Sequence, residues 1–178
     1  MTNTIQRKKM FEHVIKRCPS SKRTIVFNNV RYFIAIPNTV YVFTYSRLKN
    51  KKFKVESFKV FFSSGKSKNQ IATPAFFFGN VSQYGEVCFG KSIKRIHKTK
   101  SDMISNYLSI FWQSKFSSAF TNTILHENFI CEVSALTKYN FSKAVKKVLS
   151  FPVWAANTHH PARQLINYHT FSGEEESL

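Results

Sequence analysis

Three runs of β-branched and aromatic residues, joined by short connections, constrain the fold of this chain more than any other feature. The runs are Thr24–Ile36, Val40–Tyr45 and Ser57–Phe62. Such residues favour strands, and the pairs Asn28-Asn29 and Pro37-Asn38 have the composition of turns. Residues 49–54 are expected to form a basic turn or strand edge. Successive strands with short connections are typical of an antiparallel meander.

Helical periodicity is found on both sides of these strands. Asp102–Phe116 carries an apolar face and begins beside Ser101 and Asp102, either of which can cap a helix. Ser142–Ser150 has the same spacing, and residues 4–17 predict a basic helix that ends before Pro19. Residues 120–139 show no clear period. The strands and helices together predict an α+β domain in which a short antiparallel β-meander packs on helices.

Positive charge is concentrated in the first part of the chain. Of 178 residues, 27 are Lys or Arg and nine are Asp or Glu, which gives a formal charge of +18. Residues 1–100 hold 21 of the basic residues and three acidic ones, whereas residues 101–178 hold six of each. Such a surface attracts nucleic acid or acidic proteins, although lysine-rich surfaces also occur without any ligand. The residues expected on this basic face are Lys49, Lys51, Lys52, Lys54, Lys91, Lys94, Arg95 and Lys98.

Composition excludes several classes of protein. A hydrophobic fraction of 43% with 19 Phe is too high for a disordered chain. The three cysteines are odd in number and widely spaced, which excludes a disulfide scaffold and favours a reduced, cytoplasmic setting. The histidines match no standard ligand spacing, so we predict no metal and no cofactor. No apolar run approaches the roughly 18 residues of a membrane span, and we expect neither membrane association nor a secretory signal.

One segment ahead of the helix at Asp102 has a motif that carries chemistry. It reads Gly79-Asn80-Val81, three variable residues, Gly85, one residue, Val87 and Cys88. This pattern resembles the active-site segment of ubiquitin-conjugating enzymes. In that family the sequence is His-Pro-Asn, Val or Ile, three variable residues, Gly, one residue, Val or Ile, and Cys. Phe78-Gly79 stands here in place of His-Pro. The preceding meander and the following helix also suit that fold.

The wider stretch Pro74–Asn122 resembles the prokaryotic branch of this superfamily. The segments PAFFFGNVSQYGEVCFG and FWQSKFSSAFTN are similar to those of prokaryotic family D, which includes protein B of the PRTRC system. The resemblance implies a ubiquitin-conjugating-like protein of a bacterial or mobile-element conjugation system. Such a protein would carry a ubiquitin-like modifier as a thioester and pass it to an amine. The implied partners are a ThiF-like activating enzyme and a small ubiquitin-like protein.

The resemblance also assigns roles to single residues. Cys88 would be the acyl acceptor, and Asn80 would stabilise the oxyanion or the loop. Gly79, Gly85 and Gly90 would permit the backbone geometry around the cysteine. Positive neighbours such as Lys91 and Lys94 would favour the thiolate.

Two other interpretations stay open for this segment. A lone cysteine between apolar neighbours is often a small buried hydrophobe, and Asn80 is also a turn former. In that case the chain is a non-catalytic basic scaffold that binds nucleic acid or an acidic subunit within a larger assembly.

Along the chain we expect three regions: a basic N-terminal helix or extension (1–22), a ubiquitin-conjugating-like domain (23–151) and a partly mobile C-terminal extension (152–178).

Overall fold

A long hairpin that bends once forms the centre of the structure. The structure is a computed structural model that describes residues 11–63, 72–82, 84–90, 93, 95–117, 123–151 and 174–175. The hairpin arms are β1 (Glu12–Cys18) with β2 (Ser21–Phe27), and β3 (Val30–Ile36) with β4 (Asn38–Arg47). One register runs through both halves, since Cys18 pairs with Thr39 and Ser21 pairs with Ile36. The four strands are therefore two arms of one hairpin, closed by the turn at Asn28-Asn29.

Proline interrupts both arms at the bend. Pro19 and Pro37 separate the strands of each arm and have no N–H group for a ladder hydrogen bond. The N–H of Ser20 donates instead to Oδ1 of Asn38 at 2.8 Å. Beyond the bend the hairpin enters a different sheet. The main sheet has the order β6-β5-β4-β1-β9, and the second sheet has the order β3-β2-β8.

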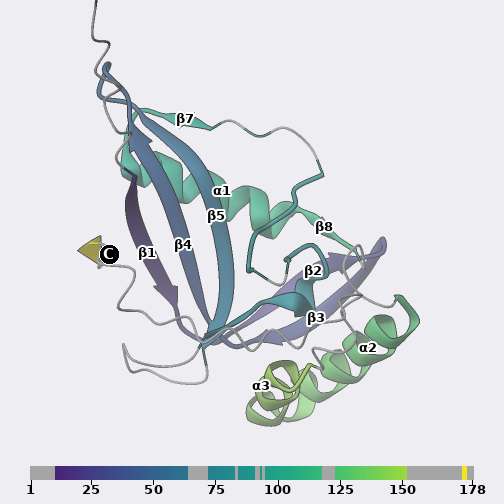
Figure 1. Ribbon diagram of the computed structural model, residues 1–178. Helices are drawn as coiled ribbons and strands as arrows, with labels where there is room; N and C mark the ends of the chain where they lie inside the picture. The colour runs from purple at the N-terminus through teal and green to yellow at the C-terminus, as the bar shows by residue number, and fades with distance from the viewer. Residues whose placement is uncertain are drawn as a thin grey trace, which may run out of the picture.

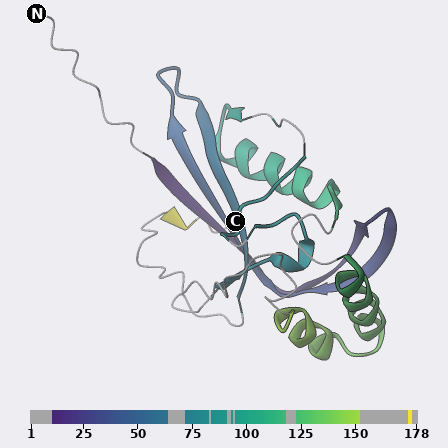
Figure 2. The same ribbon diagram turned by 45° about the vertical axis from the view of Figure 1, so that its right-hand side comes forward.

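The remaining strands extend the two sheets, and three helices pack beside them. The remaining strands are β5 (Phe53–Ser63), β6 (Ala72–Pro74), β7 (Ile96–His97), β8 (Lys115–Phe116) and β9 (Glu174–Glu175). The helices are α1 (Lys100–Gln113), α2 (Thr123–Tyr139) and α3 (Phe141–Leu149), with a 3-10 turn, η1 (Phe76–Phe78). Figures 1 and 2 show α1 along one face of the main sheet and α2 and α3 beside the second sheet, where both contact β3. No helix in the described part of the chain is long and apolar enough to cross a membrane.

Aromatic side chains hold α1 against the main sheet. Phe58 of β5 meets Tyr107 and Phe111 of α1 edge to face, with ring centroids 5.4 and 6.1 Å apart. Phe78 of η1 meets Phe111 in the same way at 5.1 Å. Such pairs contribute about 0.5–1.5 kcal/mol each beyond the area that they bury. These contacts pack η1 and β5 against the same face of α1.

The predicted α+β class is confirmed, together with most of the predicted elements. The runs at Thr24–Ile36, Val40–Tyr45 and Ser57–Phe62 are strands, and Asn28 and Asn29 form the turn with φ of 44° and 65°. The helix predicted at Asp102–Phe116 is α1, which runs from Lys100 to Gln113, whereas its predicted end at Lys115–Phe116 is strand β8, paired with β2. The helix predicted at Ser142–Ser150 is α3. The cap of α1 is Thr99 rather than Ser101 or Asp102, because Thr99 Oγ1 accepts the N–H of Asp102 at 3.0 Å.

The helix predicted over residues 4–17 is wrong where the structure describes it. Glu12–Cys18 is strand β1, paired with β4 along its whole length, so the sheet begins within the region expected to be an N-terminal extension. Val14 and Ile15 are adjacent and both buried, in two different apolar clusters. A strand covered on both faces lacks the alternation that identifies a half-exposed strand. Residues 1–10, 152–173 and 176–178 lie outside the described part of the chain.

Candidate functional site

A small hairpin carries the motif and ends at Cys88. Val81 and Val87 form an antiparallel bridge, and the N–H of Cys88 donates to the carbonyl oxygen of Asn80 at 2.9 Å. The tip is a tight turn in which the N–H of Ser82 donates to the carbonyl of Glu86 at 2.8 Å. These bonds place Asn80 and Cys88 side by side at the open end of the hairpin.

Strand β5 anchors this hairpin. The N–H of Val60 donates to the carbonyl of Gly85 at 2.8 Å, and the N–H of Val87 donates to the carbonyl of Phe58 at 3.3 Å. Gly85 has φ of +79°, and a Cβ at this position would lie 2.5 Å from the ring of Phe61. A side chain at Gly85 would therefore require either the buried Phe61 ring or the hairpin to move.

The two other glycines of the motif differ in their surroundings. Gly79 has φ of +70°, and a Cβ there would lie 1.9 Å from the carbonyl oxygen of Ser117. Gly90 has φ of +64°, and a Cβ there would have no atom of the described residues within 4 Å. All three glycines thus have positive φ, as their proposed role in shaping the backbone requires, but only Gly79 and Gly85 are seen to be confined by neighbours as well.

Asn80 is buried and incompletely hydrogen bonded. The residue is 6% exposed to solvent, and its Nδ2 donates a long hydrogen bond of 3.4 Å to the carbonyl oxygen of Cys88. Its Oδ1 is buried and has no hydrogen-bond partner among the described residues. A buried amide oxygen without a partner costs about 1–3 kcal/mol, so the burial of this side chain carries an energetic cost.

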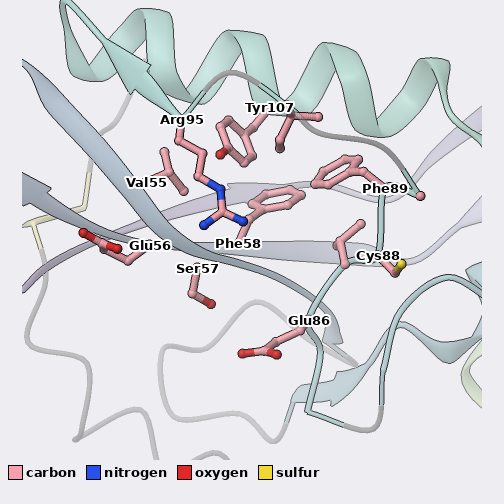
Figure 3. Close-up of a pocket in the computed structure, with 12 residues that line it drawn as sticks. Val55, Glu56, Ser57, Phe58, Glu86, Cys88, Phe89, Arg95 and Tyr107 are labelled. Carbon is pink, nitrogen blue, oxygen red and sulfur yellow. The ribbon is translucent and has the colours of Figure 1, made fainter.

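Cys88 is exposed and lies between two cavities. The first, of about 600 Å³, runs along β5 and is drawn in Figure 3, where Glu56 and Cys88 stand at opposite ends. Its lining includes Glu56, Ser57, Phe58, Glu86, Phe89, Arg95 and Tyr107. The second, of about 520 Å³, lies toward the C-terminal end of α1 and is lined by Asn80, Ile110, Gln113, Ser114, Lys115 and Ser117 among others. The thiol is therefore reachable from both sides of the hairpin.

Two carboxylates border the first cavity. Glu56 pairs with Lys54 at 3.3 Å and also accepts a hydrogen bond from Ser46. Glu86 is more exposed and lies 3.8 Å from Lys59. The described residues include no cluster of three His, Cys, Asp or Glu side chains that could hold a metal ion. The polar groups around the cavity therefore include a thiol, two carboxylates, the guanidinium of Arg95 and the hydroxyl of Tyr107, with the Asn80 amide beside the thiol.

The predicted basic residues gather at one end of the main sheet. Lys49, Lys51 and Lys52 lie on the exposed turn between β4 and β5, and Arg95 and Lys98 flank β7, which pairs with β5. We call these five residues the basic pole. Lys54 is on β5 and is engaged by Glu56, whereas Lys91 and Lys94 lie outside the described residues. Most of the predicted basic face is thus one cluster, close to the cavity that leads to Cys88.

Sequence reasoning missed several residues around the thiol. Phe58, Phe89 and Tyr107 form the aromatic wall of the first cavity, and Arg95 reaches into it (Figure 3). Tyr107 belongs to the predicted apolar face of the helix, but no local pattern places that face beside Cys88. Of the two other cysteines, Cys18 is half-buried, and burial raises the pKa of its thiol, whereas Cys131 is exposed on α2.

Comparisons of the chain with protein-family models, with curated proteins and with solved structures give no match.

Proposed function

We propose that this chain is a ubiquitin-conjugating-like protein of a prokaryotic conjugation system, in which Cys88 carries a ubiquitin-like modifier as a thioester. The observation that carries the proposal is the exposed Cys88 at the open end of an anchored hairpin, beside the buried amide of Asn80. The order of antiparallel strands, cysteine hairpin and helix along the chain agrees with the resemblance in the motif. A cysteine that serves only as a small hydrophobic core residue would be buried, whereas Cys88 is exposed.

The proposed reaction has two acyl transfers. The Cys88 thiolate attacks the thioester carbonyl of an activated modifier, a new carbon–sulfur bond forms, and the thiol of the activating enzyme leaves. A deprotonated lysine amine then attacks the Cys88 thioester, an amide bond forms, the carbon–sulfur bond to Cys88 breaks, and the proton that the amine loses passes through water to the leaving thiolate. In both steps a negative charge develops on the carbonyl oxygen. The Nδ2 of Asn80, held by one long hydrogen bond, is the nearby donor that would stabilise it.

A chemical acyl donor tests this proposal without the activating enzyme. We would incubate the protein with a short peptide thioester that ends in Gly-Gly and measure the intact mass before and after treatment with hydroxylamine. The expected product is a hydroxylamine-sensitive adduct on Cys88 that Cys88→Ala abolishes. Cys131→Ser is the matched control, because Cys131 is also exposed but has no predicted role. Equal acylation of Cys88 and Cys131 would contradict a dedicated acyl site.

Alkylation across pH gives a second, independent readout. The rate at Cys88 relative to Cys131 within the same molecule, located by mass spectrometry, reports the thiolate fraction at each site. Faster labelling of Cys88 at neutral pH supports the proposal. Labelling of Cys88 only after unfolding would make it a core residue and remove the chemical basis of the mechanism.

A second candidate function is a non-catalytic scaffold, which the basic pole favours. All five of its residues are exposed, and none has an ion-pair partner among the described residues. A scaffold that holds nucleic acid would bind oligonucleotides with a steep salt dependence. Binding of that kind, together with an acyl-transfer assay in which Cys88 is inert, would favour the scaffold over the carrier.

A further inference from the structure

The basic pole and the cysteine cavity adjoin at one side chain. A third cavity, of about 720 Å³, lies at the basic pole and is lined by Lys52, Arg95, Ile96, His97, Lys98, Asp102 and Asn106. Arg95 lines this cavity and also the cavity that ends at Cys88. Figure 3 shows the Arg95 guanidinium extending into the cysteine cavity beside Phe58. The two cavities therefore adjoin at Arg95, and we call them together the track.

The pole end of this track is rich in hydrogen-bond donors. Lys52, Arg95 and Lys98 contribute cationic groups, against the single carboxylate of Asp102. The Nδ2 of Asn106 is buried and has no acceptor among the described residues. The first turn of α1 lies here too, and the helix dipole adds positive potential at that end. A ligand that presents several carboxylates would satisfy these groups.

The cysteine end of the track has the opposite character. Its wall is apolar, formed by Phe58, Phe89 and Tyr107, and the carboxylates of Glu56 and Glu86 stand at its border. Both carboxylates have lysine partners, Lys54 and Lys59, and Arg95 is the one cationic side chain among the described residues that line this cavity, so an anion gains little at this end. The track thus changes from cationic to largely apolar over its length.

This change separates two classes of occupant. Nucleic acid carries one negative charge at every nucleotide, so a bound strand would place phosphates along the apolar wall of the cysteine cavity, where Arg95 is the one cationic side chain among the described lining residues. The described part of the track also has most of its aromatic rings at the cysteine end and most of its cations at the pole, unlike a surface for stacking bases. A polypeptide can be acidic in one part and uncharged in another, and it matches both ends.

We infer that the track from the basic pole to Cys88 binds an acidic polypeptide, with its glutamate- or aspartate-rich part on Lys52, Arg95 and Lys98 and an uncharged, partly apolar end beside Cys88. Arg95 stands at the junction and positions the polypeptide at the entrance to the cysteine cavity. What happens to that end at the thiol rests on the proposed function, but the binding itself does not need the thiol.

The binding test therefore uses the Cys88→Ala protein. The probe is a fluorescent peptide with a run of glutamates followed by Leu-Leu-Gly-Gly, measured by fluorescence anisotropy at physiological salt. The double variant Lys52→Glu with Arg95→Glu reverses two charges of the track. The matched control is Arg31→Glu with Lys138→Glu, which makes the same change in net charge at two exposed residues elsewhere. All four side chains lack ion-pair partners among the described residues, so we expect the variants to fold.

The expected result is that the track variant binds the peptide at least about tenfold more weakly, because each reversal replaces an attraction by a repulsion, while the control changes affinity far less. A peptide with the glutamates at the Gly-Gly end should bind more weakly than the probe, since it would place them against the apolar wall beside Cys88 instead of on the cations of the pole. Equal loss in the two double variants would mean unspecific attraction to a basic protein and would overturn the inference. Tighter binding of a single-stranded oligonucleotide, lost in the track variant alone, would assign the pole to nucleic acid instead.

Acylation separates this inference from the proposed function. If the track variant loses peptide affinity but Cys88 of the parent protein never accepts an acyl group, the track stands and the carrier function fails. If a glutamate-rich peptide thioester acylates Cys88 with the same concentration dependence in the parent and in the track variant, the chemistry stands and the track is wrong.

Discussion

Asn80 and Cys88 are joined by two hydrogen bonds of unequal strength. The N–H of Cys88 donates to the Asn80 carbonyl at 2.9 Å, whereas the Asn80 side chain donates back to the Cys88 carbonyl at 3.4 Å. The short bond fixes the backbone at the open end of the hairpin. The long bond is weak, so the amide can turn toward a new acceptor at little cost. This pairing holds a hydrogen-bond donor beside the thiol without committing it to the protein's own backbone.

Replacing Asn80 by Ala should separate chemistry from stability. Loss of an oxyanion donor lowers acyl transfer by on the order of 10²-fold. Stability should change little, because the variant loses one weak hydrogen bond and also removes a buried oxygen that lacks a partner among the described residues. The measurement is single-turnover release of a preformed Cys88 thioester by lysine, with the thermal midpoint as control. A fall in transfer that only follows a fall in the thermal midpoint would make Asn80 a structural residue of the hairpin.

Gly79→Ala and Gly90→Ala form a matched pair of substitutions. Both glycines have φ in the left-handed region, where an L-residue costs about 1–2 kcal/mol. The described structure leaves open space around Gly90, so we expect that cost alone. Gly79 lies against the carbonyl oxygen of Ser117, so its substitution also displaces backbone and should exceed about 3 kcal/mol. Urea unfolding of both variants measures the difference in the free energy of unfolding. Equal destabilisation would show that the backbone at Ser117 moves aside at little energetic cost.

Sequence patterns predict those elements whose conformation depends mainly on residues close together in the chain. The turn at Asn28-Asn29 is recognisable because Asn tolerates positive φ, and α1 because one of its faces is apolar. Strand β1 cannot be recognised in this way, because Phe11, Val14 and Ile15 repeat at helical spacing. The two faces of the strand on which Val14 and Ile15 are buried exist only once the sheet has assembled. Helix α2 has no clear signal either, since Ile124 and Leu125 at its start are exposed, which blurs any apolar stripe.

The candidate site shows the same division. The motif predicts Cys88, Asn80 and the glycines, since these lie within one short segment of the chain. It could not predict that Arg95 enters the cysteine cavity, because this depends on β7 pairing with β5 at Phe53 and Lys54. The exposure of Cys88 likewise follows from how the hairpin stands on β5 and from no property of its neighbours in sequence.

The turn of the bent hairpin allows a stabilising substitution. Asn29 has φ of 65°, and its Oδ1 accepts an exposed, long hydrogen bond from Lys115 at 3.3 Å. A two-residue turn with positive φ at both positions prefers Asn-Gly, so Asn29→Gly should stabilise the protein by about 0.5 kcal/mol. Asn28→Gly is the contrasting variant: it loses the 2.6 Å bond from Asn28 Nδ2 to Glu127 on α2 and should destabilise by about 1 kcal/mol. Thermal or urea unfolding gives both values, and the same sign for both variants would contradict this account of the turn.

A buried histidine should make the stability depend on pH. His126 of α2 is fully buried, and its Nε2–H donates to the carbonyl oxygen of Phe77 at 2.6 Å, among the rings of Phe27 and Phe151. Burial lowers the pKa of His126 from 6.5 to about 4. Between these values the unfolded chain binds a proton that the folded chain does not. The free energy of unfolding is therefore unaffected by this group above about pH 6.5, and it falls as the pH drops toward 4, by about 3 kcal/mol in total.

The variant His126→Gln isolates this contribution, because the glutamine amide can still donate to Phe77 but does not titrate in this range. We expect the urea midpoint of the parent protein to fall more steeply between pH 7 and pH 4.5 than that of the variant, once the separate loss of packing at pH 7 is subtracted. Carboxylates that titrate at the lower end of the range are common to both proteins and cancel in the comparison. Parallel pH profiles would show that His126 accepts a proton in the folded state as readily as in the unfolded chain, and that the aromatic cage around it admits charge.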